Sequence, residues 1–162
     1  MKTILKSQDV RFSVCYRSPL GTILLTGTEQ ALTHLRFIDE STAISSAKLP
    51  PALEQTIRWL DLYFNGQQPD FLPPLYLQGT PFQQKVWREL LKITYGKTLT
   101  YGSLAQRVGC RSAQAVGQAL HRNPIAIIVP CHRVVGAGGA LTGYAYGLPR
   151  KQSLLDMERL KV

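Results

Sequence analysis

The sequence lacks any apolar run that could cross a membrane, and it contains few cysteines. Its longest uninterrupted apolar run covers residues 125–129, far below the ~18 residues of a membrane span. The segment MKTILKSQDVRF at its start holds no apolar stretch of signal-peptide length. The three cysteines, Cys15, Cys110 and Cys131, cannot pair evenly and form no CxxC motif. Their number and spacing argue against a disulfide scaffold, and we expect a cytoplasmic protein in a reducing compartment.

Acidic residues are scarce in the second half of the chain. Residues 1–78 hold seven Lys or Arg and seven Asp or Glu, whereas residues 79–162 hold twelve basic residues and three acids. The net charge of +9 therefore lies entirely in the second half. A basic surface that serves solubility alone is one interpretation. A segregated excess of this size favours a polyanionic partner, most simply nucleic acid.

Internal repeats and low-complexity tracts are also absent, and the first half indicates strands followed by a helix. Alternating apolar residues predict short antiparallel strands at residues 12–16, 22–26 and 32–37. A helix is expected at residues 52–64, ended by Asn65-Gly66. Its buried face should hold Leu53, Ile57, Leu60 and Phe64. The proline-rich residues 69–74 are the best candidate for a linker.

The second half has a helical rhythm. Thr80 with Pro81 and Gln83 is typical of a helix start, and the buried face should hold Val86, Trp87, Leu90 and Leu91. A second helix is expected at residues 101–108, stopped by Gly109. A third should run from the cap Ser112 to Arg122, with Ala113, Val116, Gly117 and Leu120 inward. The two short helices and their tight turn form a helix-turn-helix pattern.

The third predicted helix has an outer face of small residues. Gln114, Gln118 and Arg122 project from it at helical spacing. Close packing against a neighbouring element would explain the small residues. A slim helix that enters the minor groove of DNA, which is about 6 Å wide, is the alternative.

The sequence Pro130-Cys131-His132-Arg133 follows the apolar run directly and carries reactive groups. A cysteine behind an apolar run is commonly a small core side chain. Neighbouring cations lower a thiol pKa, and a nearby base can take its proton directly or through one water. Adjacent side chains seldom meet head-on, so a water-bridged relay from Cys131 to His132 is the expected geometry. Glu158 is available to orient the imidazole.

These residues resemble the active-site motif of the O6-alkylguanine-DNA alkyltransferases, also called methylated-DNA–protein-cysteine methyltransferases. The resemblance spans nearly the whole chain. Further segments that look like family blocks, in family order, are Gly79–Trp87, Tyr95-Gly96, Tyr101-Gly102, Leu104-Ala105, Ala115-Val116-Gly117, Asn123-Pro124, Gly143-Tyr144 and Leu154-Leu155 to Glu158. The first half contributes the weaker Ser18-Pro19-Leu20-Gly21 and Tyr63-Phe64-x-Gly66.

The resemblance implies an α+β fold in two domains. Residues 1–75 would form a small ribonuclease-H-like α/β domain, and residues 76–162 a mostly helical, winged-helix-like domain with the reactive cysteine. It also implies direct-reversal DNA repair, in which Cys131 takes the alkyl group of a flipped O6-alkylguanine in one turnover. O4-alkylthymine is an alternative substrate. We expect duplex DNA carrying O6-alkylguanine as the partner, a monomer, and neither cofactor nor metal.

The resemblance also implies roles for single residues. Cys131 matches the acceptor, His132 the residue that takes its proton, Glu158 the acid behind it, and Asn123 the residue that ties the preceding turn. The expected substrate- and DNA-binding residues are Tyr101, Arg111, Gln114, Gln118, Arg122, Arg133, Val134, Tyr144, Ala145 and Tyr146. Taken singly, Tyr101 could be a helix-start aromatic, Asn123 a turn former and Glu158 a surface acid.

Two positions depart from the family pattern. Gln114 stands where many members have an arginine that fills the gap left by the flipped nucleotide, and Arg111 is close enough in sequence to compensate. Tyr146 stands where the pocket loop often has a glycine. We expect Tyr146 to narrow the alkyl-binding side of the pocket.

Other classes of protein share parts of this pattern. A helix-turn-helix transcription factor would explain the basic charge but does not require Pro-Cys-His-Arg. A relative that only binds lesions would lack the acceptor cysteine. A Cys-His hydrolase would need an oxyanion site, for which the sequence carries no signal. Zinc ligation by Cys15, His34, Cys110 or His121 matches no common spacing.

Overall fold

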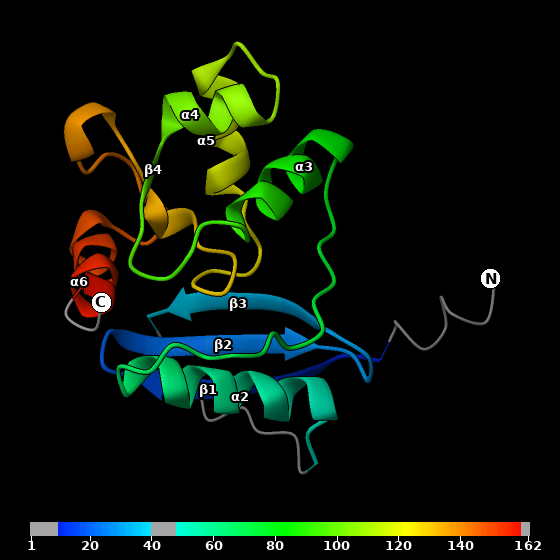
Figure 1. Ribbon diagram of the computed structural model, residues 1–162. Helices are drawn as coiled ribbons and strands as arrows, with labels where there is room; N and C mark the ends of the chain where they lie inside the picture. The colour runs from blue at the N-terminus through cyan, green and yellow to red at the C-terminus, as the bar shows by residue number, and fades with distance from the viewer. Residues whose placement is uncertain (1–9, 40–47, 160–162) are drawn as a thin grey trace. The chain divides into compact units, whose positions relative to one another are not determined.

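The computed structural model describes residues 10–39 and 48–159, and the chain divides into two compact units, residues 1–77 and 78–162 (Figure 1). Each unit has a core of its own, with Leu25 and Leu60 buried in the first and Trp87 and Leu120 in the second. The expected division into domains of residues 1–75 and 76–162 stays a prediction. Within the described ranges, no helix is long and apolar enough to cross a membrane.

The first unit contains a three-stranded antiparallel meander and one helix. Strands β1 (Phe12–Ser18), β2 (Gly21–Gly27) and β3 (Leu32–Ile38) pair in the order β1-β2-β3. Cys15 pairs with Leu24, and Leu24 pairs with Arg36. Helix α2 (Pro51–Phe64) covers the sheet face that carries Ile23 and Leu25 (Figure 1). The expected meander and helix are confirmed.

The buried face of α2 differs from the expected one. Ile57 and Phe64 are half-buried, whereas Thr56, Trp59 and Tyr63 are buried. Thr56 fits this face because its hydroxyl donates to the carbonyl of Ala52 at 2.8 Å, which satisfies the polar group. The rings of Trp59 and Tyr63 stack with centroids 5.2 Å apart. A search for aliphatic residues at helical spacing overlooks both features.

The proline-rich segment does not end as a free linker. The amide of Leu32 donates to the carbonyl of Pro74 at 2.8 Å, and the amide of Tyr76 donates to the carbonyl of Leu32 at 2.9 Å. Leu75 thereby forms a parallel bridge with Leu32. The end of the expected linker is therefore held at the start of β3 and belongs to the first unit.

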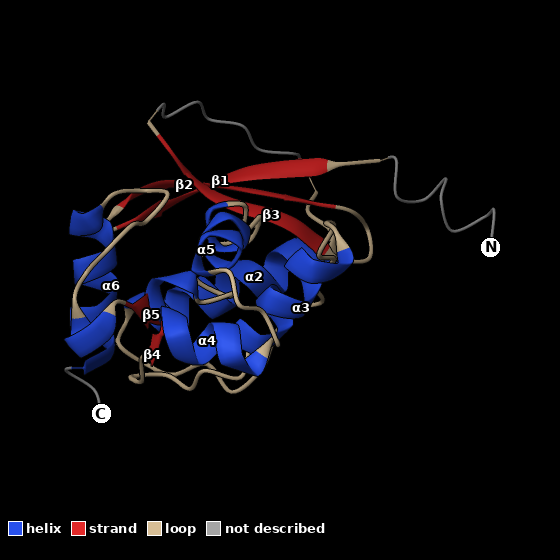
Figure 2. Cartoon of the chain, turned by 90° about the horizontal axis from the view of Figure 1, so that it is seen from above, coloured by secondary structure: helices blue, strands red, loops and turns tan. Residues whose placement is uncertain are grey.

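The second unit is mostly helical, as expected. Its elements are α3 (Pro81–Leu90), β4 (Leu99–Thr100), α4 (Tyr101–Arg107), α5 (Ala113–His121), η1 (Cys131–Arg133), β5 (Val134–Val135), η2 (Ala137–Gly139) and α6 (Leu148–Arg159). The two short strands pair in parallel, with Leu99 opposite Val134. Figure 2 shows this pair beside α4 and α6. Because β5 directly follows η1, the strand pair also holds η1, which carries the reactive cysteine, against α6.

Side-chain caps fix the starts of the three helices before the reactive segment. Thr80 and Gln83 form the expected capping box of α3, with bonds of 3.0 and 3.1 Å. The hydroxyls of Thr100 and Ser112 accept from the amides of Ser103 and Ala115 at the starts of α4 and α5. At the other end of α3, Leu91 is the C-cap residue and is half-buried. It therefore does not belong to the buried face of α3, where the sequence predicted it.

Helix α5 buries a different face from the expected one. Val116, Ala119 and Leu120 are buried, whereas Ala113 is exposed and Gly117 is half-buried. The indole of Trp87 in α3 donates to the carbonyl of Ala119 at 2.8 Å, which sets this orientation. A Cβ added at Gly117 would meet no atom within 4 Å. The small residue at Gly117 therefore belongs to an open face and not to a packed one.

Candidate active site

The reactive cysteine follows two very tight backbone turns. The amide of Ile128 donates to the carbonyl of Ala126 at 2.7 Å, and the amide of Cys131 donates to that of Val129 at 2.8 Å. The first turn places Ile127 at a φ of 69°, a region that β-branched residues rarely occupy. Strain of this kind persists where the surrounding structure holds it in place. Here it fixes the path of the chain into η1.

Asn123 is the side chain that holds these turns. Its Nδ2 donates to the carbonyl of Val129 at 2.7 Å, and its Oδ1 accepts from the amide of Ile125 at 3.0 Å. Asn123 is buried, so both bonds are shielded from water. The amide group thus ties both ends of residues 125–129 together directly before the cysteine.

Cys131 lies in the wall of a cavity of about 610 Å³. The cavity is lined by Tyr101, Gln114, Gly117, Gln118, Leu120, His121, Arg122, Cys131, Gly143, Tyr144 and Ala145. These residues come from α4, α5, η1 and the loop before α6. The cysteine is 7% exposed. The volume is large enough for a single nucleobase-sized group.

His132 and Glu158 form a buried pair beside the cysteine. The Nε2 atom of His132 lies 2.6 Å from Oε2 of Glu158, and neither side chain is more than 1% exposed. The other carboxylate oxygen of Glu158 accepts from Nε of Arg133 at 2.7 Å and from the amide of Gly96 at 3.3 Å. Arg133 also donates to the carbonyl of Ile93 at 2.8 Å. The carboxylate is thus held by three donors.

This arrangement determines which groups are charged. Burial raises the pKa of Glu158, but the hydrogen bonds that it shares with His132 and Arg133, together with the positive charge of Arg133, outweigh it and lower that pKa to about 2. Burial lowers the pKa of His132, and Glu158 opposes only part of this effect. His132 is therefore neutral at pH 7, and Arg133 is the lasting positive partner of Glu158. With its proton on Nε2 toward Glu158, the imidazole keeps Nδ1 as an acceptor.

The Nδ1 atom of His132 is buried and, among the described residues, has no hydrogen-bond partner. A proton acceptor for the Cys131 thiol needs such a nitrogen. Burial raises the pKa of Cys131, against smaller lowering effects of Asn123 and Lys151. Arg133, whose charge is engaged by Glu158, is not among the groups that lower this pKa. The thiol keeps its proton at rest and needs a base.

The structure brings seven of the expected site residues to the cavity wall. They are Tyr101, Gln114, Gln118, Arg122, Cys131, Tyr144 and Ala145. Gln114 and Gln118 are exposed on α5, and Arg122 is exposed at its C-cap. Tyr146 is half-buried and packs its ring edge-to-face against Tyr144, with centroids 5.7 Å apart. It therefore contacts a residue of the cavity wall and is not itself among the lining residues.

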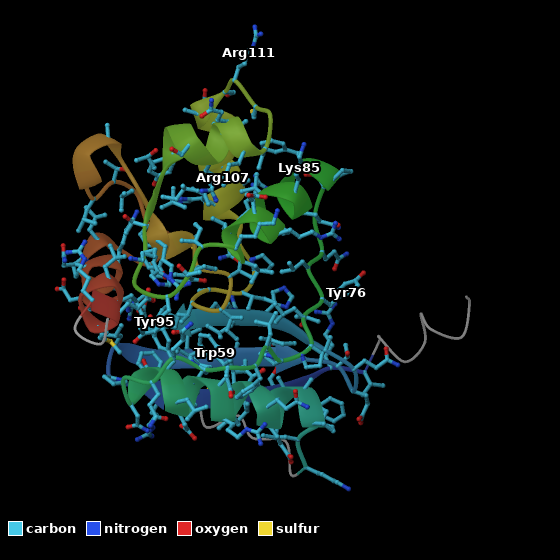
Figure 3. All side chains as sticks on the ribbon, in the orientation of Figure 1. Trp59, Tyr76, Lys85, Tyr95, Arg107 and Arg111 are labelled. Carbon is cyan, nitrogen blue, oxygen red and sulfur yellow. The ribbon has the colours of Figure 1, made fainter. Side chains whose placement is uncertain are left out.

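Two of the expected contact residues are buried, and a third lies on an exposed turn. Arg133 is 7% exposed and bound to Glu158 and Ile93, so it does not reach DNA. Val134 is fully buried in β5 and is not part of the cavity wall. Arg111 is exposed on the turn before α5 and points away from the rest of the unit (Figure 3).

Lys151 is a site residue that the sequence analysis missed. It is fully buried, and its Nζ donates to the carbonyls of Thr142 at 2.9 Å and Gly143 at 3.2 Å. A signal for it exists in the sequence. Lys151 precedes Leu154, Leu155 and Glu158 by three, four and seven residues, so all four share one face of a helix.

Metal-binding groups do not cluster in the part of the chain that the structure describes. No set of three or more His, Cys, Asp or Glu side chains there could hold a metal ion. Cys15 and Cys110 are half-buried and free of disulfides.

Comparison with known proteins gives matches over both units. Residues 81–160 match the DNA binding domain of 6-O-methylguanine DNA methyltransferase, and residues 13–77 match its ribonuclease-like domain. The Methylated-DNA--protein-cysteine methyltransferase of Mycobacterium leprae is 47% identical over 149 residues, covering 90% of each chain. That of Methanosarcina acetivorans is 45% identical over 148 residues, covering 88% of this chain and 95% of its own.

Solved structures agree with these matches. The crystal structure of Mycobacterium tuberculosis O6-methylguanine methyltransferase superposes with a TM-score of 0.83 at 41% identity, over 94% of this chain and 95% of that one. The Mycobacterium tuberculosis protein OGT in complex with DNA gives a TM-score of 0.83 at 43% identity, over 93% and 94%. An O6-methylguanine DNA methyltransferase from Methanococcus jannaschii gives 0.68 at 31% identity, over 92% and 95%.

Proposed function

The chain belongs to the 6-O-methylguanine DNA methyltransferase family, and from this premise we propose which of its residues carry out alkyl transfer. As a member of that family it is a methylated-DNA–protein-cysteine methyltransferase, which repairs O6-alkylguanine by moving the alkyl group onto a cysteine of the protein. We assign this role to Cys131. The observation that carries the assignment is its position in a cavity wall beside the buried His132–Glu158 pair.

The reaction balances with the groups at this site. The Sγ atom of Cys131 forms a bond to the alkyl carbon, and the bond between that carbon and O6 of guanine breaks. The thiol proton moves to Nδ1 of His132 through a bridging water, and it returns to N1 of the departing guanine. Glu158 stabilises the transient imidazolium. The resulting thioether is too stable to hydrolyse, so each molecule reacts once.

Asn123 and Tyr144 are assigned supporting roles. Asn123 holds the turns that present Cys131, through its bonds to residues 125 and 129. Burial raises the pKa of Tyr144 well above its usual range, so its phenol keeps its proton. The hydroxyl is buried without a hydrogen-bond partner among the described residues. It is therefore a donor that a base in the cavity would satisfy.

We propose that duplex DNA binds along α5 and that the damaged base turns out of the helix into the cavity. The open face at Gly117 and the exposed Gln118 and Arg122 support binding in the minor groove. Gln114 would fill the gap in the stack, by hydrogen bonding and without a charge. Tyr101, at the cavity mouth, would contact the flipped nucleotide. We also propose a monomer in a reducing, cytoplasmic location, because the reaction consumes a free thiol.

The test is mass spectrometry of the protein after mixing with a duplex that contains O6-methylguanine. We expect one added methyl group on the peptide that contains Cys131. Cys131→Ser should bind the duplex and accept no methyl group, because an alcohol at neutral pH provides almost no alkoxide. Cys15→Ser and Cys110→Ser are the matched controls and should accept one methyl group. Methylation of Cys131→Ser would overturn the assignment.

A further inference from the structure

Lys151 is the buried lysine among the described residues, and its charge is not paired there. The side chain is fully buried in α6. No carboxylate among those residues lies within ion-pair distance of its Nζ. Its partners are instead the neutral carbonyls of Thr142 and Gly143, at 2.9 and 3.2 Å. A buried ammonium without a counter-charge is costly to maintain.

Both partner carbonyls belong to the loop that forms one wall of the cavity. Gly143 lines the cavity together with Tyr144 and Ala145. The carbonyl of Thr142 also accepts from the hydroxyl of Tyr101 at 2.9 Å. The ammonium lies 5.8 Å from the centre of the Tyr101 ring, within range of a cation–π contact. Lys151 therefore stands directly behind the wall and joins it to α6.

The other cationic or ionisable groups around Cys131 do not supply a free buried charge. Arg133 is engaged by Glu158, and His132 is neutral. His121 and Arg122 line the cavity with exposed side chains, and the charge of Arg122 is screened by water. Burial keeps the phenol of Tyr144 protonated by raising its pKa. Among the described residues, Lys151 is thus the buried positive charge near the thiol that no carboxylate pairs with.

We propose that Lys151 is a positioning residue for alkyl transfer, which anchors the wall at residues 142–145 and directs an uncancelled positive charge at the anion formed in the cavity. This inference rests on the proposed function. Negative charge resides first on the sulfur of Cys131 and then on the departing guanine. A fixed charge held by neutral carbonyls stabilises both without rearranging. In agreement, the charge of Lys151 lowers the pKa of Cys131 against the effect of burial.

The experiment compares Lys151→Met, Lys151→Gln and Lys151→Arg in a background with Cys15→Ser and Cys110→Ser. Gln keeps a donor for the loop carbonyls without the charge, and Arg keeps the charge. Lys97→Met is the matched control, because Lys97 is an exposed lysine of the same unit. Two quantities are measured for each protein. One is the pH midpoint of Cys131 alkylation by iodoacetamide without DNA, and the other is the single-turnover rate with saturating O6-methylguanine duplex.

We expect Lys151→Met and Lys151→Gln to raise the midpoint by roughly one pH unit or more and to slow methyl transfer at least about tenfold at pH 7. Lys151→Arg should recover much of the rate, and Lys97→Met should match the parent. A parental rate and midpoint in Lys151→Gln would overturn the proposal, because hydrogen bonding alone would then suffice. If Lys151→Met does not fold, Lys151→Gln decides. The midpoint is measured without DNA, so a failure of the proposed function appears separately, as a parent protein that accepts no methyl group.

Discussion

Nε2 of His132 lies 2.6 Å from Oε2 of Glu158, in an interior where both side chains are excluded from water. The pair fixes the imidazole with Nδ1 free to accept a proton. Because Arg133 binds the second oxygen of the same carboxylate at 2.7 Å, Glu158 stays ionised while His132 stays neutral. Proton acceptance by His132 and the orientation of its ring therefore both depend on the carboxylate of Glu158.

Glu158→Gln should slow methyl transfer by roughly 100-fold, the lower end of what general acid–base catalysis contributes. It should also lower the free energy of unfolding by about 3 kcal/mol, since Arg133 loses its buried partner. Single-turnover rates and urea unfolding measure the two effects. Asp156→Asn, an exposed acid of the same helix, is the matched control and should change neither. A parental rate in Glu158→Gln would remove Glu158 from the mechanism.

Acid should destabilise the protein in two steps. His132 has a lowered pKa, so its contribution to stability is present above its ordinary value near 6.5 and is lost as the pH falls below it. Glu158, with a pKa lowered to about 2, contributes fully above its ordinary value of 4.5 and loses this contribution as the pH falls toward 2. Urea unfolding at pH 7, 5 and 3 measures the decline. In Glu158→Gln the decline should be smaller, and an equal decline would contradict the prediction.

DNA binding should depend steeply on salt. Each phosphate contact contributes about 0.9 to the slope of log affinity against log salt concentration on duplex DNA. Arg122→Gln should reduce that slope by roughly one, because Arg122 is exposed at the cavity wall on the proposed DNA face. Arg17→Gln, an exposed arginine of the first unit, is the control.

Undamaged duplex should bind nearly as well as methylated duplex, since one methyl group adds only ~1 kcal/mol. Strong preference for one undamaged sequence would instead favour a transcription factor.

Tyr146 should restrict the size of the alkyl group. Its ring packs edge-to-face against Tyr144 in the cavity wall, with centroids 5.7 Å apart, so we expect it to limit the movement of Tyr144 that a bulky group would need. Tyr146→Gly should speed the reaction with free O6-benzylguanine about tenfold, equivalent to 1.4 kcal/mol, with little change for O6-methylguanine in DNA. Tyr146→Phe keeps the ring and should behave like the parent. An unchanged or slower benzyl reaction in Tyr146→Gly would refute a restrictive role.

Local sequence patterns predict most of the helices and strands, but they do not always predict which face of a helix is buried. The cap at Thr80 is determined within four residues, so the start of α3 is readable from the sequence. The buried face of α2 is not, because Thr56 and Tyr63 become buried only when the hydroxyl of Thr56 finds its partner and the ring of Tyr63 stacks. The end of the proline-rich segment pairs with Leu32, more than forty residues earlier in the chain, and no local pattern indicates that pairing.

Site residues can be predicted from the sequence where they belong to a short local motif. Cys131, His132 and Glu158 follow from a short motif and one acid. The role of Arg133 does not, because its partners, Ile93 and Glu158, lie far along the chain in both directions. Lys151 was missed because a basic residue in a helix suggests a solvated surface. Its position on the same face as Leu154, Leu155 and Glu158 indicates burial instead.

The left-handed backbone at Ile127 limits how this protein can be made more thermostable. Glycine would relieve the strained φ, but Ile127 is 1% exposed, and removal of its side chain would leave a cavity that costs several kcal/mol. Any other residue with a Cβ would keep the strain. Asn123 cannot be exchanged either, because its two bonds span the strained segment. Stabilising substitutions should therefore be sought away from residues 123–131, at positions that take no part in presenting the reactive cysteine.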